Sequence, residues 1–214
     1  MIILVGGIKG GSGKTTIATH LAVIRSQQGK DVLLVDADDQ ETASDFTILR
    51  NEKMSGNAGY TSIKLTGSAV RTELLRLSTK YDDVIIDTGG RDTTSQRAAI
   101  SIAHKMIIPF VPRSFDIWTI EKVAGLVGEM QQANPSIQVF TFLNRIDARG
   151  ADNKEAEDIL KETPIIKFMD APIGTRKAFG NAAAQGLSVT ELKPQDDKAS
   201  AEIMMLYKYI FDII

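Results

Sequence analysis

A glycine-rich segment near the start of the chain contains the residues best suited to bind phosphate. It comprises Gly10, Gly11, Ser12, Gly13, Lys14, Thr15 and Thr16. Glycines let the backbone curl so that successive N–H groups point at anionic oxygens. In such a loop the lysine binds the β- and γ-phosphates of a nucleoside triphosphate, and the hydroxyl of the next threonine binds Mg²⁺. The segment therefore predicts a phosphate-binding loop, with Lys14 and Thr15 in these roles.

The sequence on either side supports this interpretation. The apolar run Ile2–Val5 predicts a strand, and residues 14–28 predict a helix that ends at Gly29. A helix that begins at the loop adds the positive potential of its N-terminus. The alternative, a chance glycine-rich turn, does not account for a strand before the segment and a helix after it.

One residue departs from the common pattern G-x-x-x-x-G-K-[ST]. Ile8 stands where that pattern has its first glycine, and Lys9 follows it. A lysine at this position cannot easily turn back onto the nucleotide of its own chain. Lys9 therefore requires a separate explanation.

Two predicted strands each end in an aspartate. Residues 31–36 and 83–87 contain apolar runs that end in Asp36 and Asp87. In open α/β sheets the carboxyl ends of the strands form the ligand crevice, so both carboxylates are expected beside the phosphates. Acidic groups so close to a triphosphate require a cation, and Mg²⁺ with oxygen ligands is the natural one. We interpret Asp87 as a residue that holds Mg²⁺ directly or through water. The alternative is an aspartate that starts a turn.

The segment from Lys9 to Thr16 resembles the deviant Walker A box of the ParA/MinD ATPases. In that family the additional lysine reaches across a dimer interface to the nucleotide of the partner subunit. The resemblance implies this role for Lys9, and it implies ATP and Mg²⁺ as cofactors.

Residues 36–40, Asp-Ala-Asp-Asp-Gln, resemble the second acidic box of the family, D-x-D-x-Q. The resemblance implies that Asp36 belongs to the metal shell, with Thr15 and Asp87, and that Asp38 positions the attacking water. A carboxylate near the γ-phosphate can accept a hydrogen bond from that water. Proline often stands in the family at the position of Asp39, which we expect only to be solvated.

Three further segments resemble features of the family. Residues 88–92 correspond to the second switch, whose paired glycines would let the loop rearrange with the γ-phosphate. Arg91 in this segment either serves an interface or faces solvent. Asn144 matches the position that contacts the adenine edge, and the alternative is a turn residue that caps the following loop. Residues 112–116 resemble a proline-containing segment that we interpret as structural.

The composition limits the classes of protein to consider. The chain has 214 residues, which suits one α/β domain. Its net charge of −2 shows no overall basicity of the kind that indicates binding of nucleic acid. It has no cysteine, which excludes disulfides, thiolate catalysis and the nitrogenase iron protein, a relative whose cluster needs cysteine ligands. With only two histidines, a histidine-rich metal site is not expected.

Apolar runs alternate with amphipathic segments along the chain. Strands are expected at 2–5, 31–36, 60–65, 83–87, 105–110, 137–143 and 165–166, and helices at 14–28, 41–52, 70–80, 94–103, 117–132, 150–162, 173–184 and 198–213. This alternation predicts an α/β fold with a mostly parallel twisted sheet and helices on both faces. No repeat or linker divides the chain, so residues 1–214 are expected to form a single P-loop ATPase domain of the deviant Walker A type.

The last third of the chain bears on two possible partners, DNA and a lipid membrane. ParA proteins bind DNA without sequence preference through basic residues of their late helices, and the candidates here are Lys167, Arg176, Lys177, Lys193 and Lys198. Acidic neighbours leave a solvated face as the alternative. MinD relatives end in a helix that binds lipid, but residues 203–214 contain only one cation, Lys208. Because lipid-binding helices need a basic face, we expect this helix to pack on the sheet rather than bind a membrane.

These features together resemble a ParA-type partition ATPase. The resemblance implies an ATP-dependent homodimer that binds nonspecific DNA and is released when a ParB-like adaptor stimulates otherwise slow hydrolysis. The first strand begins at residue 2 and no signal peptide precedes it, so we expect a cytoplasmic protein similar to the small ParA proteins and associated with the nucleoid in its ATP state.

Other functions remain open on the sequence. A MinD-like or cargo-positioning ATPase would use the same switch on a membrane or a protein scaffold. A P-loop kinase of small molecules would explain the glycine loop but not Lys9 or the D-x-D-x-Q box. Asp38 argues against a non-catalytic nucleotide-binding module.

Overall fold

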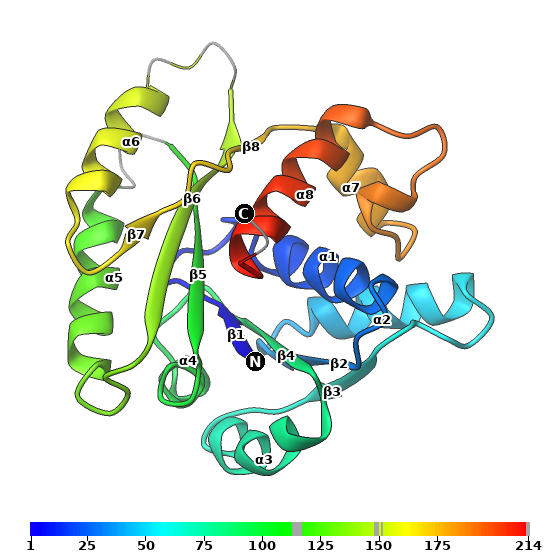
Figure 1. Ribbon diagram of the computed structural model, residues 1–214, viewed down its shortest axis with the longest axis horizontal. Coiled ribbons are helices and arrows are strands. Elements are labelled where there is room, and N and C mark those ends of the chain that lie inside the picture. Colours follow the sequence, from blue (N-terminus) through cyan, green and yellow to red (C-terminus); the bar gives the residue numbers. More distant parts are fainter. Residues whose placement is uncertain (113–116, 148–149, 151, 213–214) are drawn as a thin grey trace.

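The computed structural model of the chain describes residues 1–112, 117–147, 150 and 152–212 (Figure 1). Most of the proline-containing segment, residues 113–116, lies outside the described residues.

The strands form one parallel sheet. Their bounds are Ile2–Val5 (β1), Val32–Ala37 (β2), Thr61–Lys64 (β3), Asp83–Thr88 (β4), Lys105–Phe110 (β5), Gln138–Ile146 (β6), Lys167–Phe168 (β7) and Ile173–Gly174 (β8). The order along the sheet is β3-β2-β4-β1-β5-β6-β7, β8 pairs with β6, and every pairing among the described strands is parallel. The expected fold class is therefore confirmed.

The register of the central strands places three strand ends at one level of the sheet. Val5 of β1 pairs with Asp87 of β4, and Asp36 of β2 pairs with the same residue. Because parallel strands present their carboxyl ends at one edge, the loops after β1, β2 and β4 all open there.

Helices cover both faces of the sheet (Figure 1). Their bounds are Lys14–Gln27 (α1), Thr42–Lys53 (α2), Ala69–Leu77 (α3), Thr94–Ile100 (α4), Ile117–Met130 (α5), Asp152–Glu162 (α6), Lys177–Ala183 (α7) and Asp197–Ile210 (α8), with 3₁₀ turns at Ser78–Lys80 (η1) and Val189–Glu191 (η2). One core joins α1, α2, α7 and α8 to one face, and a second core joins α3, α4, α5 and α6 to the other. Alternate residues of β1, β2, β4, β5 and β6 enter the two cores, as the pleat of a strand requires.

The C-terminal helix α8 is packed on the sheet, as expected. Ile203, Leu206, Tyr207 and Ile210 are buried in the core that contains α1. The ammonium group of Lys105, on β5, donates to the carbonyl oxygen of Ile210 at 2.8 Å, which closes the C-terminal end of the helix. Among the described residues, no helix is both long and apolar enough to span a lipid bilayer.

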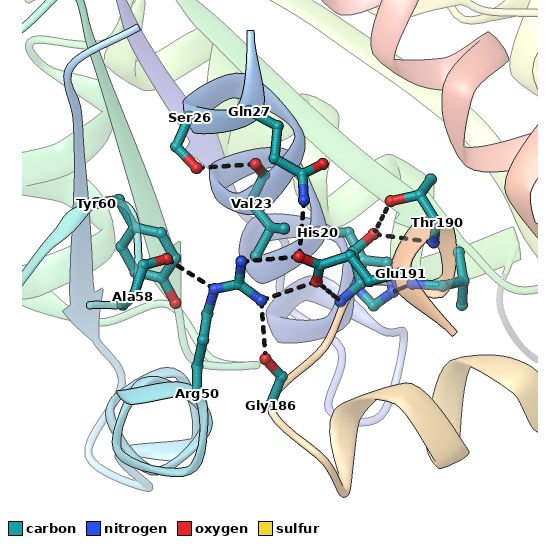
Figure 2. A network of polar contacts seen from close by, with 12 residues as sticks. His20, Val23, Ser26, Gln27, Arg50, Ala58, Tyr60, Gly186, Thr190 and Glu191 are labelled. Atoms are coloured by element: carbon teal, nitrogen blue, oxygen red, sulfur yellow. Dashed lines mark hydrogen bonds and ion pairs between the residues drawn. The ribbon is translucent and has the colours of Figure 1, made fainter. Parts of the chain in front are cut away.

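A buried ionic network joins α1 and α2 to the segment after α7 (Figure 2). The guanidinium of Arg50, on α2, makes two hydrogen bonds to the carboxylate of Glu191, at 2.8 and 2.9 Å. It also donates to the carbonyl oxygens of Ala58 and Gly186. Gln27, in the last turn of α1, donates to the same Glu191 carboxylate at 2.7 Å. One carboxylate therefore holds both helices.

Several expected elements differ from the structure in their bounds. The strand expected at 165–166 lies two residues later, at β7, and the helix expected at 173–184 begins only at Lys177 because Ile173 and Gly174 form β8. Strand β6 extends to Ile146, beyond the expected end at residue 143, so it offers further backbone groups for pairing. Ile173 pairs with its end, which satisfies buried peptide groups that a helix would have left unpaired.

Candidate functional site

The phosphate loop lies between β1 and α1 and depends on glycine at residue 13. Gly13 has a left-handed backbone, with φ of 94°. A Cβ atom at this residue would lie 2.5 Å from the side-chain nitrogen of Asn144, which donates to the Ser12 carbonyl at 2.7 Å. Any other residue would be strained and would displace the amide that supports the loop.

Lys14 is buried inside the loop. Its ammonium group donates to the carbonyl oxygen of Lys9 at 2.9 Å. Burial lowers the pKa of Lys14, and the carboxylates of Asp87 and Asp38 act in the opposite direction. The loop therefore holds its cation against two acidic residues that follow other strands, which is the arrangement expected around a bound triphosphate.

The side chain of Asp87 is buried without a hydrogen-bond partner among the described residues. Neither of its carboxyl oxygens accepts a hydrogen bond there. The pKa of Asp87 is raised to about 7, chiefly by burial and also by the neighbouring Asp36, although Thr15 and Lys14 act in the opposite direction. The oxygens of this buried carboxyl group are unsatisfied, and a metal cation beside it would satisfy both.

Asp36 makes hydrogen bonds that the sequence did not predict. One oxygen accepts from the backbone N–H and the hydroxyl of Ser44, both at 2.8 Å, and the other accepts from the backbone N–H of Asp38 at 3.2 Å. Ser44 lies in the first turn of α2, so Asp36 orients this helix and the loop before it. Its place in the metal shell stays a prediction.

The donor set fits Mg²⁺ bound together with a nucleotide. No group of three or more His, Asp or Glu side chains that could hold a metal occurs in the described part of the chain. Mg²⁺ usually keeps only one or two protein carboxylates and takes its other oxygens from water and substrate phosphates. Asp87, with the hydroxyl of Thr15 beside it, provides such a partial set.

The loop after β4 contacts both neighbouring loops through its two glycines. A Cβ atom on Gly89 would lie 2.9 Å from a carboxyl oxygen of Asp38, and one on Gly90 would lie 2.5 Å from the backbone nitrogen of Gly10. The segment expected to be the second switch therefore touches the phosphate loop and the acidic box directly. Asp39 is exposed, as expected.

A cleft of about 610 Å³, which we call the phosphate cleft, lies beside the phosphate loop. Its lining includes the phosphate loop, Asp38, Gly89, Gly90, Arg91 and Arg145. A second hollow of about 360 Å³, which we call the lateral cleft, adjoins it and is lined by Gly13, Thr16, Asn144, Arg145, Ile173 and Phe179, among others. A nucleotide has a charged and an apolar end, and the two adjoining clefts offer a place for each.

Asn144 supports the phosphate loop. Its amide group is buried and supports the loop through Ser12, and its carbonyl oxygen accepts from the backbone N–H of Arg145 at 3.0 Å. It also lines the lateral cleft. The contact with adenine stays a prediction, as does the contact of Lys9 with a partner's nucleotide, which a single chain does not test.

The structure separates the basic residues that were grouped as DNA contacts. Lys177, Lys193 and Lys198 are exposed and line one shallow hollow, together with Asp196 and Asp197. Lys167 lies apart, on β7, with its ammonium group 5.8 Å from the ring centroid of Phe140. Arg176 lines the same hollow but forms an ion pair with Glu202 of α8.

Sequence analysis missed three residues of the site. Gln96, on α4, accepts hydrogen bonds from the backbone of Gly7 and the hydroxyl of Thr88, both at 3.2 Å, and so ties the start of the phosphate loop to β4. Ser44 supports Asp36, and Arg145 lines both clefts. None of the three belongs to a recognisable motif, so no sequence signal was available.

The fold and the site define a P-loop nucleotide-binding protein. In a comparison with known protein families, residues 3–189 match the CobQ/CobB/MinD/ParA nucleotide binding domain. The chain belongs to this family, as the deviant Walker A box indicated.

Related proteins and solved structures match this chain over nearly its whole length. The maintenance of carboxysome distribution protein A of Halothiobacillus neapolitanus is 23% identical over 202 residues, which cover 94% of this chain and 92% of that protein. The ATP complex of a McdA variant from Cyanothece has a TM-score of 0.80 and 20% identity, with 99% and 96% of the two chains covered. A putative plasmid partition protein from Borrelia burgdorferi B31, bound to AMPPNP, has a TM-score of 0.78 and 20% identity, with 99% and 98% covered.

The family match shows that this chain is a nucleotide-binding protein. One structure of the same fold holds ATP, and a more distant one holds ADP and magnesium. The chain is a ParA/MinD-family ATPase related to partition proteins and to McdA.

Proposed function

We propose that this protein is a ParA-type DNA-partition ATPase, in which Mg-ATP drives a sandwich homodimer of the domain formed by residues 1–214. The observation that supports this proposal best is that Lys14 and Asp38 line one cleft, with the unpartnered carboxyl group of Asp87 near enough to Lys14 to raise its pKa. Lys9 stands at the start of the same loop, half-exposed. In the dimer each Lys9 would contact the phosphates bound by the other subunit.

The catalytic roles that we assign are those that the resemblance implies. Thr15, Asp36 and Asp87 would hold Mg²⁺, which would supply positive charge next to the phosphates. Asp38 accepts a hydrogen bond from the attacking water, and Lys14 contacts the β- and γ-phosphates. Hydrolysis is slow alone, and a ParB-like adaptor stimulates it.

Nonspecific DNA would bind the face that carries Lys177, Lys193 and Lys198. These exposed lysines share one shallow hollow, and phosphate contacts of this kind need charge rather than a fixed geometry. The protein would then be cytoplasmic and associated with the nucleoid in its ATP state. The packed helix α8 argues against lipid as the alternative surface.

Static light scattering with ATP, ADP and no nucleotide tests the dimer. The wild-type chain is expected to double in mass only with Mg-ATP, Lys9→Ala to stay monomeric, and Asp38→Ala to stay dimeric because it cannot hydrolyse. An unchanged ATP dimer of Lys9→Ala would refute the role in trans. Undiminished ATP turnover by Asp38→Ala would remove Asp38 from catalysis.

DNA co-sedimentation tests the partner. Replacing Lys177, Lys193 and Lys198 together by alanine is expected to abolish ATP-dependent binding of plasmid DNA, whereas alanine at the exposed Lys30 and Lys80 is not. If the wild-type chain bound DNA equally well with ATP, with ADP and without nucleotide, the proposed nucleotide-dependent switch would be contradicted.

A cargo-positioning ATPase is the second candidate, because the relatives include a carboxysome distribution protein. Both candidates use the same ATP dimer. A wild-type dimer that forms with ATP but does not sediment with DNA would favour a protein scaffold over the nucleoid.

A further inference from the structure

Arg145 lies where the phosphate cleft and the lateral cleft meet. Three residues that line both clefts are Gly13, Thr16 and Arg145, and of these Arg145 alone carries a charge. A ligand that extends from one cleft into the other must therefore pass the side chain of Arg145.

The backbone of Arg145 is held in a conformation that arginine disfavours. Its φ is 55°, in the left-handed region, where a residue with a Cβ atom is strained. Hydrogen bonds fix it on both sides, because its N–H donates to Asn144 Oδ1 at 3.0 Å and its carbonyl oxygen accepts from the Thr175 hydroxyl at 2.9 Å. Strained residues that their surroundings hold in this way are concentrated at ligand contacts.

The guanidinium group of Arg145 is exposed and makes no hydrogen bond or ion pair with any described residue. Its Nε atom nevertheless lies 4.0 Å from the position that a Cβ atom of Gly13 would take, so it is close to the phosphate loop. Many other arginines form ion pairs within the chain, namely Arg25, Arg50, Arg76, Arg97 and Arg176. An unpaired cation beside a phosphate loop has its natural partner in the ligand.

We propose that Arg145 is a nucleotide-binding residue whose guanidinium group contacts ATP where the phosphate chain joins the nucleoside. A planar guanidinium can pair with phosphate oxygens and can stack on a base, so it suits the junction of a charged and an aromatic part. The strained backbone fixes the direction of the side chain toward this junction. The contact does not involve the γ-phosphate, so it serves ATP and ADP alike. The proposal depends on nucleotide binding only, not on the dimer or on DNA.

Three substitutions separate the charge of this residue from its backbone. Arg145→Asn and Arg145→Gly both remove the guanidinium, and both residues adopt the left-handed backbone more readily than arginine. Arg145→Lys keeps a charge without the planar group. Arg76→Asn, on α3 and 73% exposed, removes an arginine by the same substitution far from either cleft and serves as the control.

Isothermal titration with Mg-ATP and with Mg-ADP gives the readout, and thermal unfolding without nucleotide reports on the fold. Arg145→Asn and Arg145→Gly are expected to bind both nucleotides about tenfold more weakly or worse, the usual effect of losing a charged hydrogen bond. Arg145→Lys is expected to regain part of the affinity, and Arg76→Asn to match the wild type. The unfolding midpoint of Arg145→Gly is expected to equal or exceed that of the wild type, since the strain is relieved.

Three outcomes would overturn the proposal. Unchanged affinity in Arg145→Asn would show that the side chain does not contact the nucleotide. A loss confined to ATP would place the guanidinium at the γ-phosphate instead. Weaker binding by Arg145→Gly together with a lowered unfolding midpoint would assign Arg145 to the support of the fold.

Discussion

The buried carboxyl group of Asp87 is expected to make the nucleotide-free protein less stable as the pH rises. Burial raises the pKa of Asp87 from 3.8 to about 7. Between these two values the native state keeps a proton that the unfolded chain has released, so raising the pH favours unfolding. A pKa difference of this size lowers the free energy of unfolding by roughly 4 kcal/mol when the pH rises from below both pKa values to above both. About 2–3 kcal/mol of this loss falls between pH 5 and pH 8.

Asp87→Asn tests this magnitude because asparagine keeps the shape of the side chain and cannot ionise. Urea unfolding, followed by circular dichroism between pH 5 and pH 8 without nucleotide or Mg²⁺, gives the free energy of unfolding. Between pH 5 and pH 8, the free energy of unfolding of the variant is expected to rise by about 2–3 kcal/mol relative to that of the wild type. Asp39→Asn, beside the same cleft but exposed, is the control and is expected to follow the wild type.

Parallel pH profiles of the wild type and Asp87→Asn would refute the reasoning, because the buried carboxyl group would then carry no cost. A second measurement connects the same group to its ligand. Mg²⁺ requires the ionised carboxylate, so Mg-ATP is expected to bind the wild type more weakly at pH 6 than at pH 8 and to release a proton as it binds. Asp87→Asn is expected to have lost this pH dependence along with most of its affinity.

Two further substitutions test the packing around the site. In Gly90→Ala the new Cβ atom would lie 2.5 Å from the backbone nitrogen of Gly10, so ATP affinity is expected to fall at least about tenfold while far-ultraviolet circular dichroism is retained. Gly180→Ala, on α7 with nothing within 4 Å of its Cβ position, is the control; it is expected to keep wild-type affinity and to gain about 0.5–1 kcal/mol. Glu191→Ala leaves the buried guanidinium of Arg50 without its carboxylate and is expected to lower the free energy of unfolding in urea by about 3–5 kcal/mol. Equal affinities of the two glycine variants, or a loss below about 1 kcal/mol in Glu191→Ala, would contradict these expectations.

The convergence of the acidic residues was predictable because it depends on local rules. Asp36 and Asp87 end buried apolar runs, and parallel strands bring such ends to one edge, where the register places the two residues side by side. The glycines of the phosphate loop carry an equally local signal. For these residues, the sequence contains nearly all the information that their positions require.

The chemical differences between these residues, by contrast, depend on tertiary contacts. Asp36 and Asp87 have similar surroundings in the sequence, yet Ser44 satisfies the first and no described residue satisfies the second. The pairing of Arg176 with Glu202, which reduces the cationic group expected to bind DNA, also joins distant segments. The left-handed backbone of Arg145 follows from hydrogen bonds on both of its sides, one of them from Thr175. Residue type alone does not determine such contacts.

The Arg50–Glu191 network also bears on where this domain can be cut. The match to the family ends at residue 189, two residues before Glu191. A fragment limited to the matched residues would keep the phosphate loop, the acidic box and Asn144, yet it would leave Arg50 buried without a counterion and Gln27 without its acceptor. The helices that begin at the phosphate loop and at the acidic box would lose their common attachment. Excision of this ATPase for biochemical work therefore has to include a residue that belongs to none of its nucleotide-binding motifs.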